Sequence, residues 1–486
     1  MRTEKDFIGT VEIPATALYG IHSYRASLNF PDSAPFNLHW YRAVGKVKHA
    51  CYETVINYRS ALQVEHADVI NRLQLPGEEV LKALISASLE VSAGLHFDQF
   101  IVPACQGGAG TSINLNVNEI IANRALQFLG HVPGEYTFID PIETANIYQS
   151  TNDVIPSALT VAVMELLKVL EESVNLTRKE TERLEHEHRS TLRVSFTQLQ
   201  EAVPGTYGQL FSNYSDALSR DWWRVSKAFE RIKQVNLGGG ATGIPLSLPR
   251  FYIMEVVPEL RKITGLPIAQ AENLSDCTSN FDALVEVHAI LKANAVNLEK
   301  LANDMRLLSS GLPGEKEVHI PERQTGSSIM PGKVNPVIPE FIISSAHQVY
   351  SNDMQLATLA ARGELDLNAF LPSMGHLLLQ SLELLIAMNQ TLRENLLKGL
   401  TINKELAASR LLKSPSVTTV IAPLTGYNRA ATLAAEMKSS SCNIYEANKK
   451  LGLIDHASLE KMLQPEFLLK KGFSVQDIRE IEKTKE

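Results

Sequence analysis

The sequence predicts an all-α protein built around an elongated bundle of long helices. Four stretches of the 486-residue chain place apolar residues three or four positions apart, which is the spacing of a helix with one buried face. The alternation of apolar and polar residues that marks a half-buried strand is scarce. Helices of roughly 25 residues with few strands are typical of a long bundle.

The four helical stretches follow one another after the first third of the chain. They cover residues 159–184, 284–308, 340–359 and 377–397. The first is polar enough in its later part to face solvent or a partner. The second is expected to stop at Gly311 and Pro313, because glycine and proline end helices. The last is apolar around most of its first half, which predicts that this half is buried.

Length and turn-forming residues predict three domains. A chain of 486 residues corresponds to about three domains of average size. A stretch with glycine, proline and aspartate at 130–141 and a turn near 399–403 are the candidate boundaries. We therefore expect an N-terminal domain over 1–140, the central helical bundle over 141–399, and a small C-terminal helical domain over 400–486.

Composition narrows the class of protein and of partner. The chain is 44% apolar and 21% charged, as globular proteins are, and its net charge of −8 argues against nucleic acid or an anionic membrane. We see no signal segment, and no run that approaches the ~20 apolar residues of a membrane helix, so we expect a cytoplasmic protein. The four cysteines form no CxxC pair. No metal or dinucleotide motif is present, so we expect no metal or organic cofactor.

The segment 325–336, TGSSIMPGKVNP, concentrates reactive side chains. The hydroxyls of Ser327 and Ser328, the ammonium of Lys333 and the amide of Asn335 fall within nine residues. Two glycines give the loop the freedom to move and close over a ligand. This set suits a small anion that bears an acidic C–H bond. The alternative is a plain surface linker, which the apolar Ile-Met-Pro run fits poorly.

Two further segments place hydroxyls and amides before helix-like stretches. They read QGGAGTS at 106–112, followed by alternating asparagines at 114, 116 and 118, and QSTND at 149–153. Thr111 and the residues after Gln149 could simply cap the helices that follow, the second of which is expected after Pro156. Capping and ligand binding coexist at helix N-termini. Because the asparagines alternate, at least one of them is expected to be structural.

These motifs together resemble the aspartase/fumarase superfamily. GSSIMPGKVNP resembles the family's signature loop, and the segments IPATALYGIH at 13–22, QGGAGTS and QSTND resemble three more of its motifs, in the family's order. The similarity runs from about residue 5 to about residue 465. It implies a central bundle of long helices, a smaller domain at each end, and a homotetramer. The motifs are also spread over segments that a long bundle would hold apart, so we expect neighbouring subunits to complete each active site.

The resemblance also implies a reaction on a small dicarboxylate or amino acid. The family removes a proton from the carbon beside a carboxylate and expels an amine or oxygen group from the next carbon, often giving fumarate. By resemblance, Ser327 is the base, its alkoxide stabilised by loop N–H groups and by Lys333, which with Asn335 also binds the other carboxylate. The remaining substrate-binding residues implied by the motifs are Thr111, Ser150, Thr151, Asn152, Thr197, Gln198 and Ser328.

The chain departs from the family pattern at several places. Gln198 stands where the family usually has histidine, and the stretches 140–143 and 243–247 also differ. The motifs favour a carbon–nitrogen lyase that eliminates ammonia from L-aspartate to give fumarate. The alternatives are a fumarate hydratase, a lyase for another fumarate–amine adduct, and a catalytically silent relative that acts as a binding subunit.

Overall fold

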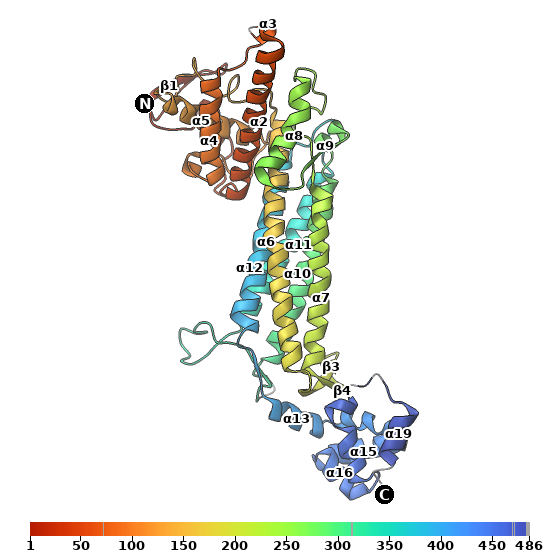
Figure 1. The fold of residues 1–486 in the computed structure, drawn as a ribbon. Helices are drawn as coiled ribbons and strands as arrows, with labels where there is room; N and C mark the ends of the chain where they lie inside the picture. The colour runs from red at the N-terminus through yellow and green to blue at the C-terminus, as the bar shows by residue number, and fades with distance from the viewer. Residues whose placement is uncertain (71, 313, 469, 471, 483–486) are drawn as a thin grey trace. The chain divides into compact units, whose positions relative to one another are not determined.

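The computed structural model describes residues 1–70, 72–312, 314–468, 470 and 472–482 (Figure 1). Contacts divide the chain into two compact units, each assembled from three segments. Unit 1 comprises Met1–Glu171, Trp223–Ala295 and Ala346–Ile386, and unit 2 comprises Glu172–Trp222, Val296–Ser345 and Ala387–Glu486. The division into three domains at residues 140 and 399 stays a prediction.

Long helices dominate the described residues, which confirms the predicted all-α class. Five of them supply residues to both units: α6 (Thr151–Glu187), α7 (Tyr207–Ile232), α10 (Asp282–Leu308), α11 (Val337–Ala360) and α12 (Leu371–Thr391) (Figure 1). The four predicted stretches lie in α6, α10, α11, and α12 with the π-helical turn η2 (Leu392–Leu397) that follows it. Pro313, expected to help end α10, lies outside the described residues. Within the described part of the chain, strands form only two-stranded sheets.

Helix α6 starts earlier than predicted. The expected start was after Pro156, but the helix begins at Thr151 and contains Pro156 in its second turn. Proline has no N–H to donate to the Asn152 carbonyl one turn before it. The Asn236 Nδ2 donates to that carbonyl instead, at 2.8 Å. A partner 84 residues away therefore replaces the missing helical hydrogen bond and allows the helix to continue through proline.

Unit 1 contains the N-terminal elements and one end of the long helices. Its shorter elements are β1 (Arg2–Lys5), β2 (Thr10–Ile13), α1 (Ile21–Asn29), α2 (Leu38–Glu65), α3 (Ala67–Ile70), α4 (Glu78–Ala93), η1 (Phe97–Gln99), α5 (Thr111–Phe128), β5 (Gln234–Val235), α8 (Arg250–Thr264), β6 (Ala269–Gln270) and α9 (Leu274–Ser279). Trp40 of α2 is fully buried and its Nε1 donates to the Ile155 carbonyl at 3.2 Å. A Cβ at Gly375 of α12 would lie 2.4 Å from the indole ring, so α12 packs on α2 at a glycine.

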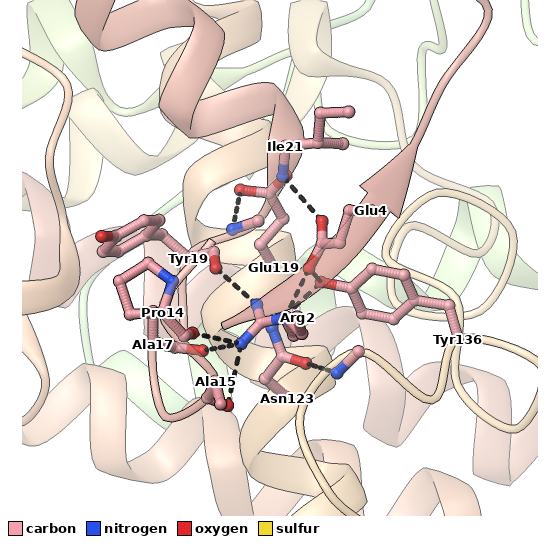
Figure 2. A network of polar contacts seen from close by, with 12 residues as sticks. Arg2, Glu4, Pro14, Ala15, Ala17, Tyr19, Ile21, Glu119, Asn123 and Tyr136 are labelled. Carbon is pink, nitrogen blue, oxygen red and sulfur yellow. Dashed lines mark hydrogen bonds and ion pairs between the residues drawn. The ribbon is translucent and has the colours of Figure 1, made fainter. Parts of the chain in front are cut away.

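Two buried carboxylates hold the start of α1 (Figure 2). Glu119 accepts the backbone N–H groups of Gly20 at 2.8 Å and His22 at 2.9 Å. Glu4 accepts the Ile21 N–H at 2.7 Å. The residue before the helix is a glycine with no capping side chain. The two carboxylates therefore satisfy N–H groups that α1 cannot satisfy itself.

A buried histidine joins three long helices within unit 1. His288 of α10 is fully buried, and its ring nitrogens lie 3.1 Å from Asp353 Oδ1 of α11 and 2.8 Å from Ser381 Oγ of α12. Burial lowers the pKa of His288. Both ring nitrogens have partners on other helices, so His288 connects α10 to α11 and α12.

Unit 2 contains the other end of the long helices and the C-terminal elements. Its shorter elements are β3 (Leu192–Thr197), β4 (Gln200–Thr206), β7 (Val318–His319), η2, β8 (Thr401–Ile402), α13 (Lys404–Lys413), η3 (Pro415–Val420), α14 (Ala422–Thr425), α15 (Tyr427–Ser440), α16 (Ile444–Leu451), α17 (His456–Met462), α18 (Pro465–Leu468) and α19 (Val475–Glu482). A cluster of buried apolar residues that includes Leu411, Leu433 and Leu459 forms the core of its C-terminal part. The Tyr214 hydroxyl of α7 donates to Asp304 of α10 at 2.7 Å.

The stretch Leu371–Leu397 has the length and apolar composition of a membrane-spanning helix. This corrects the expectation that no stretch of the chain approaches that limit. However, 61% of its most apolar window is buried inside the structure. A core helix has the same composition, because it is apolar on every face that it buries.

Candidate active site

The first group of predicted site residues lies where α6 begins, in unit 1. Ser150 precedes the helix, and its Oγ accepts the Asn152 backbone N–H at 3.2 Å. In return, the Asp153 carboxylate accepts the Ser150 N–H at 2.9 Å. This reciprocal arrangement resembles a capping box, so the helix-capping role considered for these residues is present. These capping bonds do not use the hydroxyl hydrogens of Ser150 and Thr151, which can donate to another group.

Asn152 is fastened to a distant stretch of the chain through both its backbone and its side chain. Its carbonyl, which Pro156 leaves free, accepts from Asn236 Nδ2 at 2.8 Å. Its own Nδ2 donates to the Ala241 carbonyl at 2.7 Å. The first turn of α6 is therefore held in place by residues 236–241 as well as by its own helix.

Asp153 joins the same two segments and is fully buried. Its Oδ2 accepts the N–H groups of Gly238 at 3.2 Å and Gly240 at 3.0 Å. Both glycines have positive φ, 87° and 66°, so the turn that aims these N–H groups favours glycine. Burial raises the pKa of Asp153 to about 7, and the backbone donors oppose that shift because they stabilise the charged form.

Thr111 is the first residue of α5, and its helix begins close to that of α6. Gly110 precedes it, and no side chain caps α5, which excludes the capping role considered for Thr111. A Cβ at Gly110 would lie 3.1 Å from Ile155 Cγ2, so α5 starts against the first turns of α6. The Asn114 Nδ2 donates to Thr151 Oγ1 at 3.1 Å. The structure therefore brings Thr111, Thr151 and the residues beside it together.

Two hydroxyls of this group are able to donate hydrogen bonds to a ligand. Ser150 Oγ and Thr151 Oγ1 each accept one hydrogen bond from the chain. No acceptor for either hydroxyl hydrogen lies among the described residues, so each can donate to a bound group. Two helix N-termini add partial positive charge nearby. The arrangement suits an anion that is bound by neutral hydrogen-bond donors.

One of the three alternating asparagines is structural, as expected. Asn116 accepts the Ile101 N–H at 2.8 Å and donates to the Gln99 carbonyl at 3.2 Å. Asn114 faces the other way and donates to Asn146 Oδ1 at 3.0 Å as well as to the threonine of α6. Asn114 therefore supports the binding group without lying at its surface, because its side chain is buried.

Lys48 of α2 is a buried cation that the sequence analysis did not single out. Its side chain is fully buried, and its Nζ donates to Gln149 Oε1 at 2.8 Å. Burial lowers the pKa of Lys48 to about 7, and the nearby Cys51 and Asp153 oppose that shift. A sequence signal was available: Lys48 lies four residues after Val44 and three before Cys51, on the apolar face of its helix, where a solvated lysine is not expected.

The second group lies in unit 2, and Ser327 is its central residue. The Ser327 Oγ accepts backbone N–H groups from Ile329 at 3.2 Å and Met330 at 3.0 Å. Two donors directed at one oxygen stabilise negative charge on it. This is the support that a serine needs to act as a base, and the residues that supply it belong to the same loop.

The two ends of the loop are tied together at Gly326. Its N–H donates to the Lys333 carbonyl at 2.8 Å, and its carbonyl accepts from Asn335 Nδ2 at 2.7 Å. A Cβ at Gly326 would lie 2.7 Å from the Asn335 backbone nitrogen, so this close approach needs glycine. The side chains of Ser328 and Lys333 are exposed, and the second N–H of the Asn335 amide remains available to a ligand.

Thr197 and Gln198 lie at the tip of the β3–β4 hairpin. Thr197 pairs with Gln200 across the hairpin. Gln198 and Leu199 form the two-residue turn, with φ of 53° and 61°, which is the pattern of a type I′ turn. Both predicted residues are exposed. Within the described part of the chain, no hydrogen bond connects this tip to the loop 325–336.

The ten predicted residues therefore fall into two groups rather than one. Thr111, Ser150, Thr151 and Asn152 belong to unit 1, whereas Thr197, Gln198, Ser327, Ser328, Lys333 and Asn335 belong to unit 2. A cavity of about 460 Å³ in unit 2 includes Asn335 in its lining but no other predicted residue. Over the described residues, no three His, Cys, Asp or Glu side chains are grouped to hold a metal ion. That the two groups act in one site stays a prediction.

Comparison with known proteins reveals close relatives over the full length of the chain. A protein-family model described as a lyase matches residues 9–351. The aspartate ammonia-lyase of a Bacillus species is 37% identical over 466 residues, covering 96% of this chain and 97% of the relative. The aspartate ammonia-lyase of Escherichia coli strain K12 is 35% identical over 477 residues, covering 97% of both chains.

Solved structures are also similar to this chain over nearly its whole length. A fumarate lyase:delta crystallin from Brucella melitensis is 36% identical and has a TM-score of 0.87, covering 96% of this chain and 98% of that one. A class II fumarase from Schistosoma mansoni is 26% identical, with a TM-score of 0.86 over 97% and 100% of the two chains. The family model spans more than half of the sequence, and the relatives match nearly all of it. The chain therefore belongs to the lyase family, within the aspartase/fumarase superfamily that its motifs resemble, and it is a lyase.

Proposed function

We propose that this protein is an aspartate ammonia-lyase, which eliminates ammonia from L-aspartate to give fumarate. The observation that carries the proposal is the Ser327 oxygen, which accepts two backbone N–H groups of its own loop. Relatives that bear this name and are 35–37% identical over nearly the whole chain support the choice of substrate.

In the proposed reaction Ser327, as the alkoxide, takes a proton from C3 of aspartate, the carbon beside the side-chain carboxylate. The electron pair left behind makes that carboxylate a dianion. Hydroxyl donors at Thr111, Ser150, Thr151 and Ser328 strengthen their hydrogen bonds as this second charge develops. The pair then forms the C2–C3 double bond, the C2–N bond breaks, and ammonia leaves. Lys333 and Asn335 hold the α-carboxylate, and the lysine charge favours the serine alkoxide.

The residue at position 198 favours an amine over a hydroxyl as the leaving group. Gln198 can accept a hydrogen bond from an ammonium through its amide oxygen but cannot donate a titrating proton near neutral pH. An amine leaves already protonated and needs no acid, whereas hydroxide is a poor leaving group and needs one. Asn152 and Thr197 complete the binding of the substrate in this assignment.

The proposed enzyme is a cytoplasmic homotetramer whose active sites are shared between subunits. Two observations support sharing: the predicted residues fall into two groups in separate units, and they are spread from position 111 to position 335. The alkoxide, the lysine and the Ser328 hydroxyl are then supplied by one chain, and the hydroxyls of Thr111, Ser150 and Thr151 by another.

An absorbance assay for fumarate tests the function. The purified protein is mixed in turn with L-aspartate, malate and N-substituted aspartates, and the Ser327→Ala variant serves as the matched control. We expect fumarate and ammonium from aspartate with the native protein only. Fumarate from malate without ammonium release from aspartate would make the protein a hydratase. Turnover of only a substituted aspartate would change the leaving group, and no turnover of any of them would favour a silent binding subunit.

A further inference from the structure

We infer that Asp153 is the positioning residue of the substrate-binding turn: it fixes Ser150, Thr151 and Asn152 by fastening them to the glycine turn at 238–240. The inference deepens the proposed function and rests on it, because that function makes these three residues bind the substrate. Among the described residues, the Asp153 carboxylate accepts hydrogen bonds only from backbone N–H groups.

Asp153 accepts more hydrogen bonds than a helix cap requires. A capping carboxylate takes the N–H of the residue before the helix, which Asp153 does at Ser150 through Oδ1. Its second oxygen, Oδ2, takes the N–H groups of Gly238 and Gly240, more than 80 residues further along the chain. One carboxylate thus connects the start of α6 to a separate segment.

The neighbouring residue, Asn152, connects the same two segments independently. Asn152 accepts from Asn236 through its carbonyl and donates to Ala241 through its side chain. Together with Asp153, these contacts bracket the stretch 236–241 at its two ends and in its middle. A segment joined at four points has little freedom to tilt, which is what a binding turn needs, since a misplacement of about 1 Å can cost ~100-fold in rate.

Removal of the Asp153 carboxylate would leave buried N–H groups without a hydrogen-bond acceptor. Asp153 is fully buried, so N–H groups that lose it cannot turn to water. Asparagine at this position would keep one oxygen and place an NH₂ group against the remaining donors. Either the Ser150 end or the glycine end of the connection would then be broken. Lys48, which is also buried, supports the same turn through Gln149, the residue before Ser150.

The chain offers a matched control for this substitution in Glu119. Glu119 is likewise buried in unit 1 and likewise accepts several backbone N–H groups, but those belong to Gly20, His22 and Ser23 at the start of α1. Glu119→Gln therefore removes the same kind of interaction away from the binding turn. A difference in fumarate binding between the two variants would therefore reflect where each carboxylate lies, because both variants lose a buried carboxylate.

The experiment measures the dissociation constant of fumarate by calorimetry and the kcat and KM for aspartate, with Tm as the measure of folding. For Asp153→Asn we expect weaker fumarate binding and a lower kcat/KM, each by about tenfold or more, whereas Glu119→Gln lowers Tm similarly and changes neither by more than about twofold. Equal fumarate affinity in Asp153→Asn and the native protein would overturn the inference. Native protein that binds fumarate but does not convert aspartate would overturn the proposed function alone, and native protein that binds no fumarate would overturn both.

A milder variant covers the case in which Asp153→Asn does not fold. Gly240→Ala leaves Asp153 in place and its added Cβ would make only an ordinary van der Waals contact, 3.9 Å from Pro245 Cα, but it strains a backbone that has φ of 66°. It shifts the donor that Asp153 accepts without removing it. We expect fumarate binding to weaken by about threefold to tenfold, and unchanged affinity in a folded Gly240→Ala protein would count against Asp153 as the positioning residue.

Discussion

The binding turn at 150–153 and the loop at 325–336 are held by the chain in opposite ways. The turn is fastened from outside: its partners at Asn236, Gly238, Gly240 and Ala241 are more than 80 residues away. The loop is fastened to itself. The donors to Ser327 Oγ lie two and three residues along, and the contacts of Gly326 are closed within nine residues.

This difference matches what each part has to do in the proposed reaction. Hydroxyls that meet a developing charge must be placed in advance, and only the surrounding fold can fix them. A serine base needs a stabilised oxygen, which a short loop can supply from its own backbone and carry with it as it closes. The loop can therefore be exposed and self-contained without losing its chemistry, whereas the turn cannot.

The largest effect is expected at the base. Ser327→Ala should lower kcat by ~100- to 10,000-fold, the usual contribution of a general base. Because its partners are local backbone groups in an exposed loop, the free energy of unfolding should change by less than about 0.5 kcal/mol. Steady-state kinetics and denaturant unfolding check the two parts. Ser328→Ala, its exposed neighbour, is the control and should retain more activity; if Ser328→Ala were the inactive variant instead, the base would be Ser328.

Subunit exchange tests whether the turn and the loop that form one site come from different chains. Ser327→Ala and Thr111→Val each disable one of the two groups. Mixing the two inactive proteins and allowing their subunits to exchange should restore a measurable part of the native activity, because some sites then receive both intact groups. Mass spectrometry of the mixture shows that exchange has occurred. Exchanged but inactive mixtures would place both groups of a site in one chain.

The sequence predicted features that depend on nearby residues better than features that depend on residues far along the chain. The spacing of apolar residues was enough to find α6 and α10, because a long helix that buries one face has apolar residues three or four positions apart. The Ser327 loop could be read in the same way, since its glycines, donors and base lie within one short motif. The start of α6 could not: Pro156 looked like a helix boundary, and the side chain of Asn236 that compensates for it lies far along the chain.

Contacts between residues far apart in the sequence were also missed for the residues that support the site. The glycines at 238–240 lack the spacing of a dinucleotide motif, and nothing near them in the sequence shows that Asp153 is their partner. Lys48 was visible as a charge on an apolar helix face, but its contact with Gln149 was not. Motif resemblance predicted which residues meet the substrate, and the structure was needed to find the buried residues that hold the predicted ones in place.

A smaller effect is expected at the hairpin tip, which belongs to unit 2 but lies outside the loop 325–336. Gln198→His should leave aspartate turnover within about tenfold, roughly 1.4 kcal/mol of barrier, because imidazole can also accept from the amine. Histidine tolerates the positive φ of this position. The pH dependence of kcat/KM should gain a titration near pH ~6 to 7, the ordinary range of histidine. If the substitution instead created aspartate turnover that the native protein lacks, the native substrate would be a different compound.

The smallest effect is expected at Glu119, and it is an effect on Tm. Glu119 is a buried carboxylate that does not hold the binding turn, so it contrasts with Asp153. Its partners are the N–H groups of Gly20, His22 and Ser23 and the Ser23 hydroxyl, and the titratable groups Glu4 and Tyr136 interact with it electrostatically. Burial raises the pKa of Glu119 from 4.5 to about 7.

The sign of the resulting pH dependence follows from the proton balance. Between pH 4.5 and about 7 the folded protein holds a proton at Glu119 that the unfolded chain has released. The stabilising contribution of this group is therefore complete below pH 4.5 and is lost as the pH rises through about 7. Glutamine does not titrate, so the Tm difference between the native protein and Glu119→Gln should narrow from pH 5 to pH 8, by on the order of 2–4 °C. Parallel Tm curves for the two proteins would show that Glu119 is ionised across this range, because its four donors would then outweigh the effect of burial.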